Sequence, residues 1–146
     1  MNQRTILVAD DETHILNVVS VKLRNAGYRV ITAEDGQEAL DRALAELPDL
    51  IITDYQMPYL SGVELCSRLR AEPATRDVPV ILLTARGFGI SQDDLEVENI
   101  KRVILKPFSP REVSACVSDL LAACPVDSEP VSTGGGRLDE GGAPSG

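Results

Sequence analysis

The feature that most constrains the fold of this chain is an alternation of short apolar segments, rich in β-branched residues, with longer segments of helical periodicity. The short segments predict strands, and the longer ones, with apolar residues three or four positions apart, predict helices. We expect strands at residues 5–9, 29–33, 50–53, 80–83 and 103–105. We expect helices at residues 13–26, 35–47, 61–71, 91–98 and 109–124. Five alternations of strand and helix predict a parallel sheet covered by helices on both faces.

The composition divides the chain into a folded body and a tail. Residues 1–124 are enough for one domain with a substantial core. Residues 125–146 hold 6 of the 11 glycines and 3 of the 9 prolines, with few large apolar side chains. We therefore expect a disordered tail from residue 125 onward, and a linker or a short docking peptide is the alternative.

Charge and hydropathy exclude several classes of protein. Asp and Glu number 23 against 14 Lys and Arg, and the net charge of -9 argues against direct binding to nucleic-acid phosphates. The apolar runs are too short to span a bilayer, and the first residues lack a signal-peptide core. Three cysteines without a framework spacing indicate a reducing compartment. We expect a cytoplasmic protein with no membrane insertion.

Three of the expected helices begin with the same capping device. A cap residue is followed three positions later by Glu, so that the two side chains can satisfy each other's unpaired backbone N–H groups. The pairs are Asp35 with Glu38, Ser61 with Glu64, and Ser109 with Glu112.

Charged and polar side chains gather where the expected strands end. Asp10 and Asp11 follow the first strand, and Asp54 follows the third. Thr84 ends the fourth strand, and Lys106 follows the fifth. In an open α/β sheet, ligands bind outside the carboxyl ends of the strands, near the point where the strand order reverses. We expect these side chains to converge in one pocket at that edge.

Three converging carboxylates need a compensating charge. Two like charges about 4 Å apart repel each other by about 4 kcal/mol at an effective dielectric of about 20. Oxygen ligands of this kind suit Mg²⁺, and a nearby ammonium supplies a fixed positive charge. Acids, Mg²⁺ and Lys form a site for a phosphoryl group on an oxygen nucleophile. A carboxylate is the candidate nucleophile, because the sequence shows no Ser/His or Cys/His pairing.

These residues resemble the receiver domain of two-component response regulators, over residues 4–123. The resemblance implies a flavodoxin-like (βα)5 fold, a three-layer sandwich whose five parallel strands have the order 2-1-3-4-5. Each motif alone is weakly specific, whereas all of them in order are highly specific. The matching segments are residues 6–12, residues 54–58 with Gly62, residues 83–85 and residues 105–108.

The resemblance also implies a role for each site residue. Asp54 corresponds to the phosphoacceptor, which takes a phosphoryl group from the phospho-His of a histidine kinase. Asp10 and Asp11 correspond to the acidic pair that holds Mg²⁺ with Asp54, and the backbone carbonyl of Gln56 to a further ligand. Lys106 corresponds to the cation that pairs with the acceptor and then with the phosphoryl oxygens.

The resemblance extends to the conformational switch. Thr84 corresponds to the hydroxyl that moves toward the phosphoryl group, and the family has a cis peptide bond at the position of Lys106–Pro107. Receivers often carry an aromatic residue where this chain has Val103, which puts the usual aromatic readout in doubt. A Gly-Ala pair commonly stands where this chain has Asn99 and Ile100.

We therefore expect a single-domain response regulator that switches the binding of a downstream partner protein and is not an enzyme beyond its own phosphorylation and dephosphorylation. The alternatives are an interaction module that works without phosphorylation and a receiver fragment of a longer regulator. An aspartyl-phosphate phosphatase would have its nucleophile in an Asp-x-Asp motif on the first strand, where this chain has Asp10, Asp11 and Glu12. A flavin protein would want a Ser/Thr/Gly-rich loop there, where acids would repel the phosphate.

Overall fold

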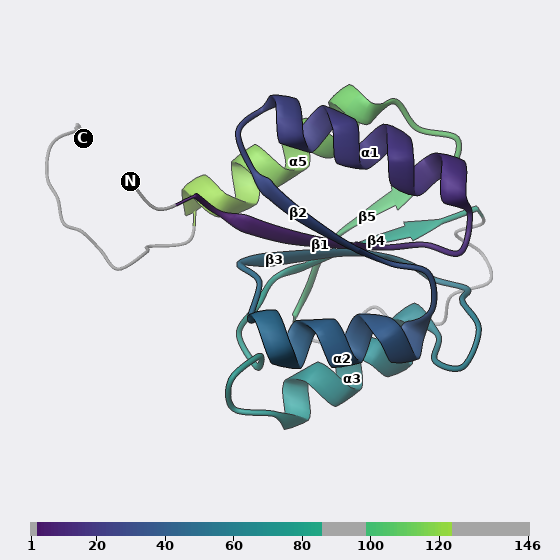
Figure 1. Cartoon of the computed structure of the whole chain (residues 1–146), viewed down its shortest axis with the longest axis vertical. Coiled ribbons are helices and arrows are strands. Elements are labelled where there is room, and N and C mark those ends of the chain that lie inside the picture. The colour runs from purple at the N-terminus through teal and green to yellow at the C-terminus, as the bar shows by residue number, and fades with distance from the viewer. Residues whose placement is uncertain (1–2, 86–98, 124–146) are drawn as a thin grey trace, which may run out of the picture.

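The fold is a five-stranded parallel sheet of order β2-β1-β3-β4-β5, seen in a computed structural model (Figure 1). The structure describes residues 3–85 and 99–123. The strands are β1 (Thr5–Ala9), β2 (Arg29–Ala33), β3 (Leu50–Asp54), β4 (Val80–Thr84) and β5 (Ile100–Leu105). The helices are α1 (Thr13–Asn25), α2 (Gly36–Glu46), α3 (Gly62–Ala71) and α5 (Pro110–Ala123). The predicted strand order is confirmed, whereas the helix expected at 91–98 and the tail from 125 lie outside the described residues.

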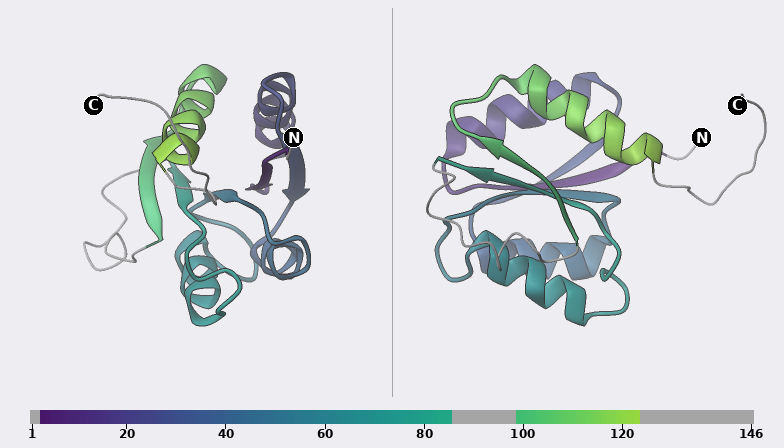
Figure 2. Two further views of the ribbon diagram at one scale, coloured as in Figure 1. Left: turned by 90° about the vertical axis from the view of Figure 1, so that its left-hand side faces the viewer. Right: turned by 180° about the vertical axis from the view of Figure 1, so that it is seen from behind.

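The helices form two layers, one on each face of the sheet. Helices α1 and α5 cover one face, and α2 and α3 cover the other (Figure 2). The central strand β1 contributes to both cores, because successive side chains of a strand point to opposite faces. Ile6 and Val8 pack toward α1 and α5, and Leu7 and Ala9 toward α2 and α3, all fully buried. The predicted three-layer sandwich is confirmed.

Two central strands end on a polar residue of the expected site, and β3 is one residue longer than predicted. Asp54 is the last residue of β3, in register with Leu83, and Thr84 is the last residue of β4, in register with Leu105. Each of these residues is paired with the next strand along the sheet, which extends the parallel ladder by one residue on that side. The two polar side chains are therefore carried by regular strand backbone rather than by loops.

The last strand begins earlier than the sequence pattern indicated. β5 starts at Ile100 instead of residue 103, and its pairing with β4 shifts register between Val80 and Ile81. The exposed Lys101 and Arg102 interrupt the apolar pattern; Arg102 pairs with Ile81 of β4, whereas Lys101 is skipped at the register shift. A local irregularity of this kind defeats a prediction that depends on side-chain alternation.

All three predicted cap residues accept a hydrogen bond from the N–H of the Glu three positions later, but the reciprocal bond is present in one pair only. Ser61 and Glu64 form the full reciprocal capping box, and Ser109 accepts a hydrogen bond from the backbone N–H of Glu112. Asp35 accepts from the N–H of Glu38. The reciprocal bond, from the backbone N–H of Asp35 to the Glu38 side chain, is not formed. The Glu38 carboxylate accepts instead from the backbone N–H of Glu34.

None of the helices within residues 3–85 and 99–123 has the length and apolar character needed to cross a membrane.

Gly62 lets helix α3 begin directly against the end of β3. A Cβ atom at this position would overlap the backbone carbonyl of Asp54 and would lie 2.9 Å from Cδ1 of Leu82. We predict that Gly62→Ala lowers the free energy of unfolding by about 1–3 kcal/mol, because the backbone that carries Asp54 must shift. Urea unfolding would measure this loss. Ser67→Ala, at an exposed position of the same helix, should change stability by less than about 0.5 kcal/mol, and equal effects of the two substitutions would contradict the prediction.

Candidate functional site

Three carboxylates meet at the carboxyl edge of the sheet. Asp10 and Asp11 follow β1, and Asp54 ends the neighbouring strand β3. One carboxylate oxygen from each residue lies within 4.8 Å of the other two. Asp10 is fully buried, Asp54 is nearly so, and Asp11 is exposed. Such a set of oxygens suits a hard divalent cation, which binds one or two carboxylates and keeps several waters.

Lys106 brings a positive charge into this cluster. Its backbone N–H donates to the carbonyl of Thr84 at 2.7 Å, which continues the β4–β5 ladder and aims the side chain across the strand ends. The ammonium Nζ lies 3.1 Å from Oδ2 of Asp10 and 3.1 Å from Oδ1 of Asp54. It also lies 2.9 Å from Oε1 of Glu12. The predicted cis peptide bond between Lys106 and Pro107 is confirmed.

Backbone hydrogen bonds fix the loops that carry these side chains. Asp10 is held by its own N–H, which donates to the carbonyl of Ala33, and by its Oδ1, which accepts from the N–H of Glu12 at 2.9 Å. On the other side of the site, the N–H of Tyr55 donates to the carbonyl of Leu83 at 2.7 Å. The acidic groups are therefore positioned by the sheet before any ligand binds.

Burial and charge perturb the protonation of the cluster. Burial, reinforced by the neighbouring Asp10 charge, raises the pKa of Asp54 from 3.8 to about 6, although Lys106 acts in the opposite direction. Burial also raises the pKa of Asp10. Burial acts to lower the pKa of Lys106, but its hydrogen bond to Glu12 and the charges of Asp54 and Asp10 outweigh this and raise the pKa. The ammonium therefore stays protonated while the acids around it compete for protons.

The cluster opens into a cavity of about 360 Å³. Asp11, Asp54, Gln56, Thr84 and Lys106 all line it, so the structure brings these predicted site residues together. The carboxylate of Asp10 is buried below them and reaches the site through Lys106. The cavity is also lined by Glu12, Tyr55 and Ala85.

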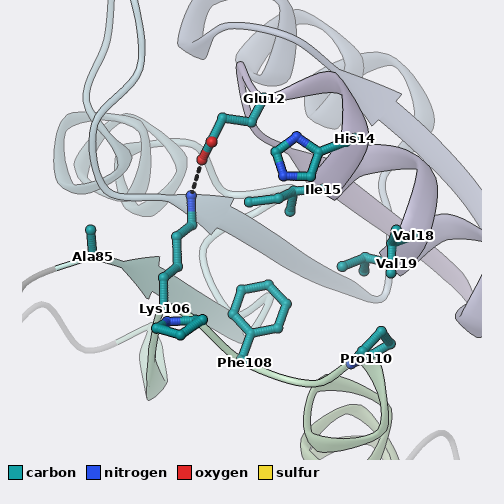
Figure 3. A pocket seen from close by; sticks show the side chains of 10 residues that line it. Glu12, His14, Ile15, Val18, Val19, Ala85, Lys106, Phe108 and Pro110 are labelled. Atoms are coloured by element: carbon teal, nitrogen blue, oxygen red, sulfur yellow. Dashed lines mark hydrogen bonds and ion pairs between the residues drawn. The ribbon is translucent and has the colours of Figure 1, made fainter.

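A second, larger and mainly apolar groove of about 470 Å³ lies beside the cavity, between the first turns of α1 and α5 (Figure 3). Ile15 and Val18 from α1 face Phe108 and Pro110 across it. Glu12, Ala85 and Lys106 line the groove as well as the acidic cavity. This groove is not apparent from the sequence, because the spacing of Ile15 and Val18 is that of an ordinary amphipathic helix.

The pairing of Glu12 with Lys106 was not predicted from the sequence either. The available signal was that Glu12 directly follows the acidic pair and so reaches the same edge of the sheet. The hydrogen bond from Lys106 holds the pKa of Glu12 below its usual range.

The chain belongs to the family of response regulator receiver domains. The family model, described as "Response regulator receiver domain", matches residues 6–118. Receiver domains are the signalling switches of two-component systems, and the predicted membership is confirmed.

Curated relatives are longer regulators. The chain is 39% identical over 142 residues to the phosphate regulon transcriptional regulatory protein PhoB of Pseudomonas aeruginosa, covering 93% of this chain and 60% of the relative. It is 41% identical over 129 residues to the alkaline phosphatase synthesis transcriptional regulatory protein PhoP of Bacillus subtilis, covering 83% of this chain and 49% of the relative. The chain thus spans about half to three fifths of the length of these relatives.

Solved structures share the fold. The chemotaxis response regulator CheY4 of Vibrio cholerae superposes with a TM-score of 0.76 at 29% identity, over 82% of this chain and 99% of that one. The receiver domain of the sensor histidine kinase PA1611 of P. aeruginosa superposes with a TM-score of 0.75 at 27% identity, over 84% and 100% of the two chains. That structure has a magnesium ion coordinated in its active-site cleft.

The raised pKa of Asp54 predicts how the stability of the metal-free protein depends on pH. Between the ordinary pKa of 3.8 and the folded value of about 6, the folded protein keeps a proton that the unfolded chain has released. This contribution stabilises the fold at low pH and is lost as pH rises through about 6. In EDTA, Asp54→Asn should therefore gain about 2 kcal/mol over the wild type between pH 4 and pH 7.

Urea unfolding at both pH values measures this difference. The exposed Asp77→Asn serves as the control and should track the wild type. A gap between Asp54→Asn and the wild type that does not change with pH would show that Asp54 titrates normally.

Proposed function

We propose that this chain accepts a phosphoryl group from the phospho-His of a sensor histidine kinase onto Asp54, in a Mg²⁺-dependent reaction, and thereby switches its binding to a downstream protein. The observation that carries the proposal is the convergence of Asp10, Asp11 and Asp54 on a cavity crossed by the ammonium of Lys106. Membership in the receiver family supports the same role.

Asp54 is the proposed nucleophile. Its carboxylate lies at the cavity on rigid strand backbone, and Lys106 holds one of its oxygens at 3.1 Å. A carboxylate oxygen attacks phosphorus in line, forming a P–O bond while the P–N bond to the donor imidazole breaks. The imidazole keeps the electron pair and takes up a proton. Lys106 then balances negative charge on the phosphoryl oxygens.

The proposed Mg²⁺ ligands are Asp10, Asp11, Asp54 and the backbone carbonyl of Gln56. The three carboxylates and the cavity position of Gln56 fit oxygen ligation. When bound, the ion would neutralise charge on the transferring phosphoryl group. Asp11 is the exposed member of the set and meets solvent at the cavity.

The proposed switch begins at Thr84. Thr84 is nearly fully buried at the end of β4 and lines the cavity, so its hydroxyl belongs to the site that a phosphoryl group would occupy. The new dianion would bias an existing equilibrium between two arrangements of this face. Val103 is 40% exposed and carries no ring, so the aromatic readout common in receivers has no counterpart at this position.

Partners follow from the same arrangement. The proposed phosphoryl donor is a sensor histidine kinase, and the apolar groove next to the cavity offers the kinase a contact surface. The net charge of -9 argues that these residues do not contact DNA phosphates themselves. The output then runs through a partner protein, or through a further segment of a longer regulator such as those its relatives represent.

We predict that Asp54→Asn abolishes labelling by a small phosphodonor such as acetyl phosphate in the presence of Mg²⁺, because an amide is not a nucleophile toward phosphorus. Mass spectrometry of the intact protein would measure the added phosphoryl group. Asp41→Asn, on the exposed face of α2, is the matched control and should label like the wild type. Undiminished labelling of Asp54→Asn would refute the acceptor assignment.

A Mg²⁺ titration separates this proposal from an interaction module that works without phosphorylation. We predict binding near millimolar Mg²⁺, with a stabilisation of about 1.4 kcal/mol once the concentration is about ten times Kd. Asp11→Asn should weaken the affinity about tenfold or more, because it removes a charged ligand from an already charged cluster. Thermal unfolding at increasing Mg²⁺ measures both effects. A wild type that does not respond to Mg²⁺ would favour the phosphorylation-independent module.

A further inference from the structure

Three carboxylates surround the ammonium of Lys106 in this structure, two as hydrogen-bond acceptors and the third as an ion-pair partner. A lysine carries three N–H donors, and three carboxylate oxygens lie within hydrogen-bonding distance of Nζ. They belong to Asp10 at 3.1 Å, Asp54 at 3.1 Å and Glu12 at 2.9 Å. A new negatively charged group at the site therefore competes with these partners for the ammonium.

The three partners differ in how readily they can leave. The side chains of Asp10 and Asp54 are 0% and 9% exposed, whereas that of Glu12 is 48% exposed. A buried carboxylate that loses its cation stays unpaired in a poorly solvated place, which is costly. Glu12 can turn into water, where its charge is solvated and the loss of one exposed ion pair is small.

Within residues 3–85 and 99–123, the Glu12 side chain at the start of α1 is hydrogen-bonded by Lys106 alone. Glu12 occupies the N-cap position, with extended backbone, but its side chain makes no capping hydrogen bond to the helix. The described contacts of its carboxylate are those with Lys106. The Glu12 side chain therefore pairs with the ammonium of Lys106 and does not cap the helix.

We propose that Glu12 is a positioning residue that occupies Lys106 in the unphosphorylated protein and is displaced when a phosphoryl group arrives on Asp54. This inference rests on the proposed function. The phosphoryl group carries three acceptor oxygens and close to two negative charges, and it needs an N–H of Lys106. Glu12 gives up its place because it is the partner that solvent accepts most readily. It thereby competes with the phosphoryl group and lowers the occupancy of the phosphorylated state.

The displacement would be felt outside the acidic cavity. Glu12 and Lys106, with Ala85, line both the cavity and the apolar groove. Figure 3 shows their ion pair at the edge of that groove, beside His14 and Ile15 of α1. Release of Glu12 removes a neutral ion pair from this shared wall and leaves a carboxylate at the mouth of the groove. A protein bound in the groove would therefore face an unpaired carboxylate after phosphorylation of Asp54, where it faced a neutral ion pair before.

The test is equilibrium binding of beryllium fluoride, a tetrahedral analogue of a phosphoryl group on a carboxylate, at saturating Mg²⁺. Fluorine NMR measures the bound fraction directly. We expect Glu12→Gln to bind the analogue about two- to fivefold more tightly than the wild type, which is the effect of losing one half-exposed ion pair. Saturating Mg²⁺ removes any contribution from a changed affinity for the ion.

Two further variants separate contact from charge. Glu12→Asp keeps the charge but shortens the side chain, and Asp at an N-cap can accept from the first-turn N–H groups of α1 instead of Lys106. It should therefore bind the analogue more tightly, as Glu12→Gln does. Glu34→Gln removes an exposed charge directly after β2, at the same edge of the sheet, from a residue that is not a partner of Lys106. It should bind like the wild type.

The outcomes are distinct. Tighter binding by both Glu12 variants, with Glu34→Gln unchanged, supports the displacement. Equal or weaker binding by Glu12→Gln overturns it, and so does a Glu12→Asp that behaves like the wild type, which would reduce Glu12 to a diffuse charge. A wild type that fails to bind the analogue at all would instead overturn the proposed function of Asp54.

Discussion

The site depends on one electrostatic balance, in which the ammonium of Lys106 holds together carboxylates that would otherwise repel each other. Asp10 and Asp54 come from neighbouring strands and both lie 3.1 Å from Nζ. One cation cannot neutralise the charges of Asp10, Glu12 and Asp54 together. The pKa of Asp54 is therefore still raised, to about 6, with burial as the main cause. The remaining negative charge is what makes the cavity suitable for a divalent cation.

The sheet makes this balance possible because it fixes the charged groups before a ligand binds. β1 and β3 are buried on both faces, so their carboxyl ends are held by two separate cores. Gly62 allows α3 to start close against Asp54, and the hydrogen bond from the N–H of Lys106 to the carbonyl of Thr84 continues the pairing of β4 with β5 toward the site. The costly convergence of charge is therefore maintained by apolar packing some distance away.

Most of this arrangement could be predicted from the sequence, because it follows from the hydrophobic periodicity of the segments and from their order along the chain. Alternating strands and helices give the sheet, and acids after successive strands must then share one edge. What could not be predicted depends on three-dimensional pairing. The early start of β5 follows from a register shift against β4. The bond between Glu12 and Lys106 joins residues 94 positions apart in the chain. The apolar groove combines α1 with the loop before α5, and neither segment reveals it alone.

The most direct test of the central claim is to locate the phosphoryl group chemically in the wild-type protein. After incubation with acetyl phosphate and Mg²⁺, borohydride reduces an acyl phosphate on aspartate to the alcohol of homoserine, and peptide mass spectrometry identifies the altered residue. The account predicts homoserine at position 54 and at no other aspartate. Homoserine at Asp10 or Asp11, or no reduced residue in a protein that has gained a phosphoryl group, would contradict it.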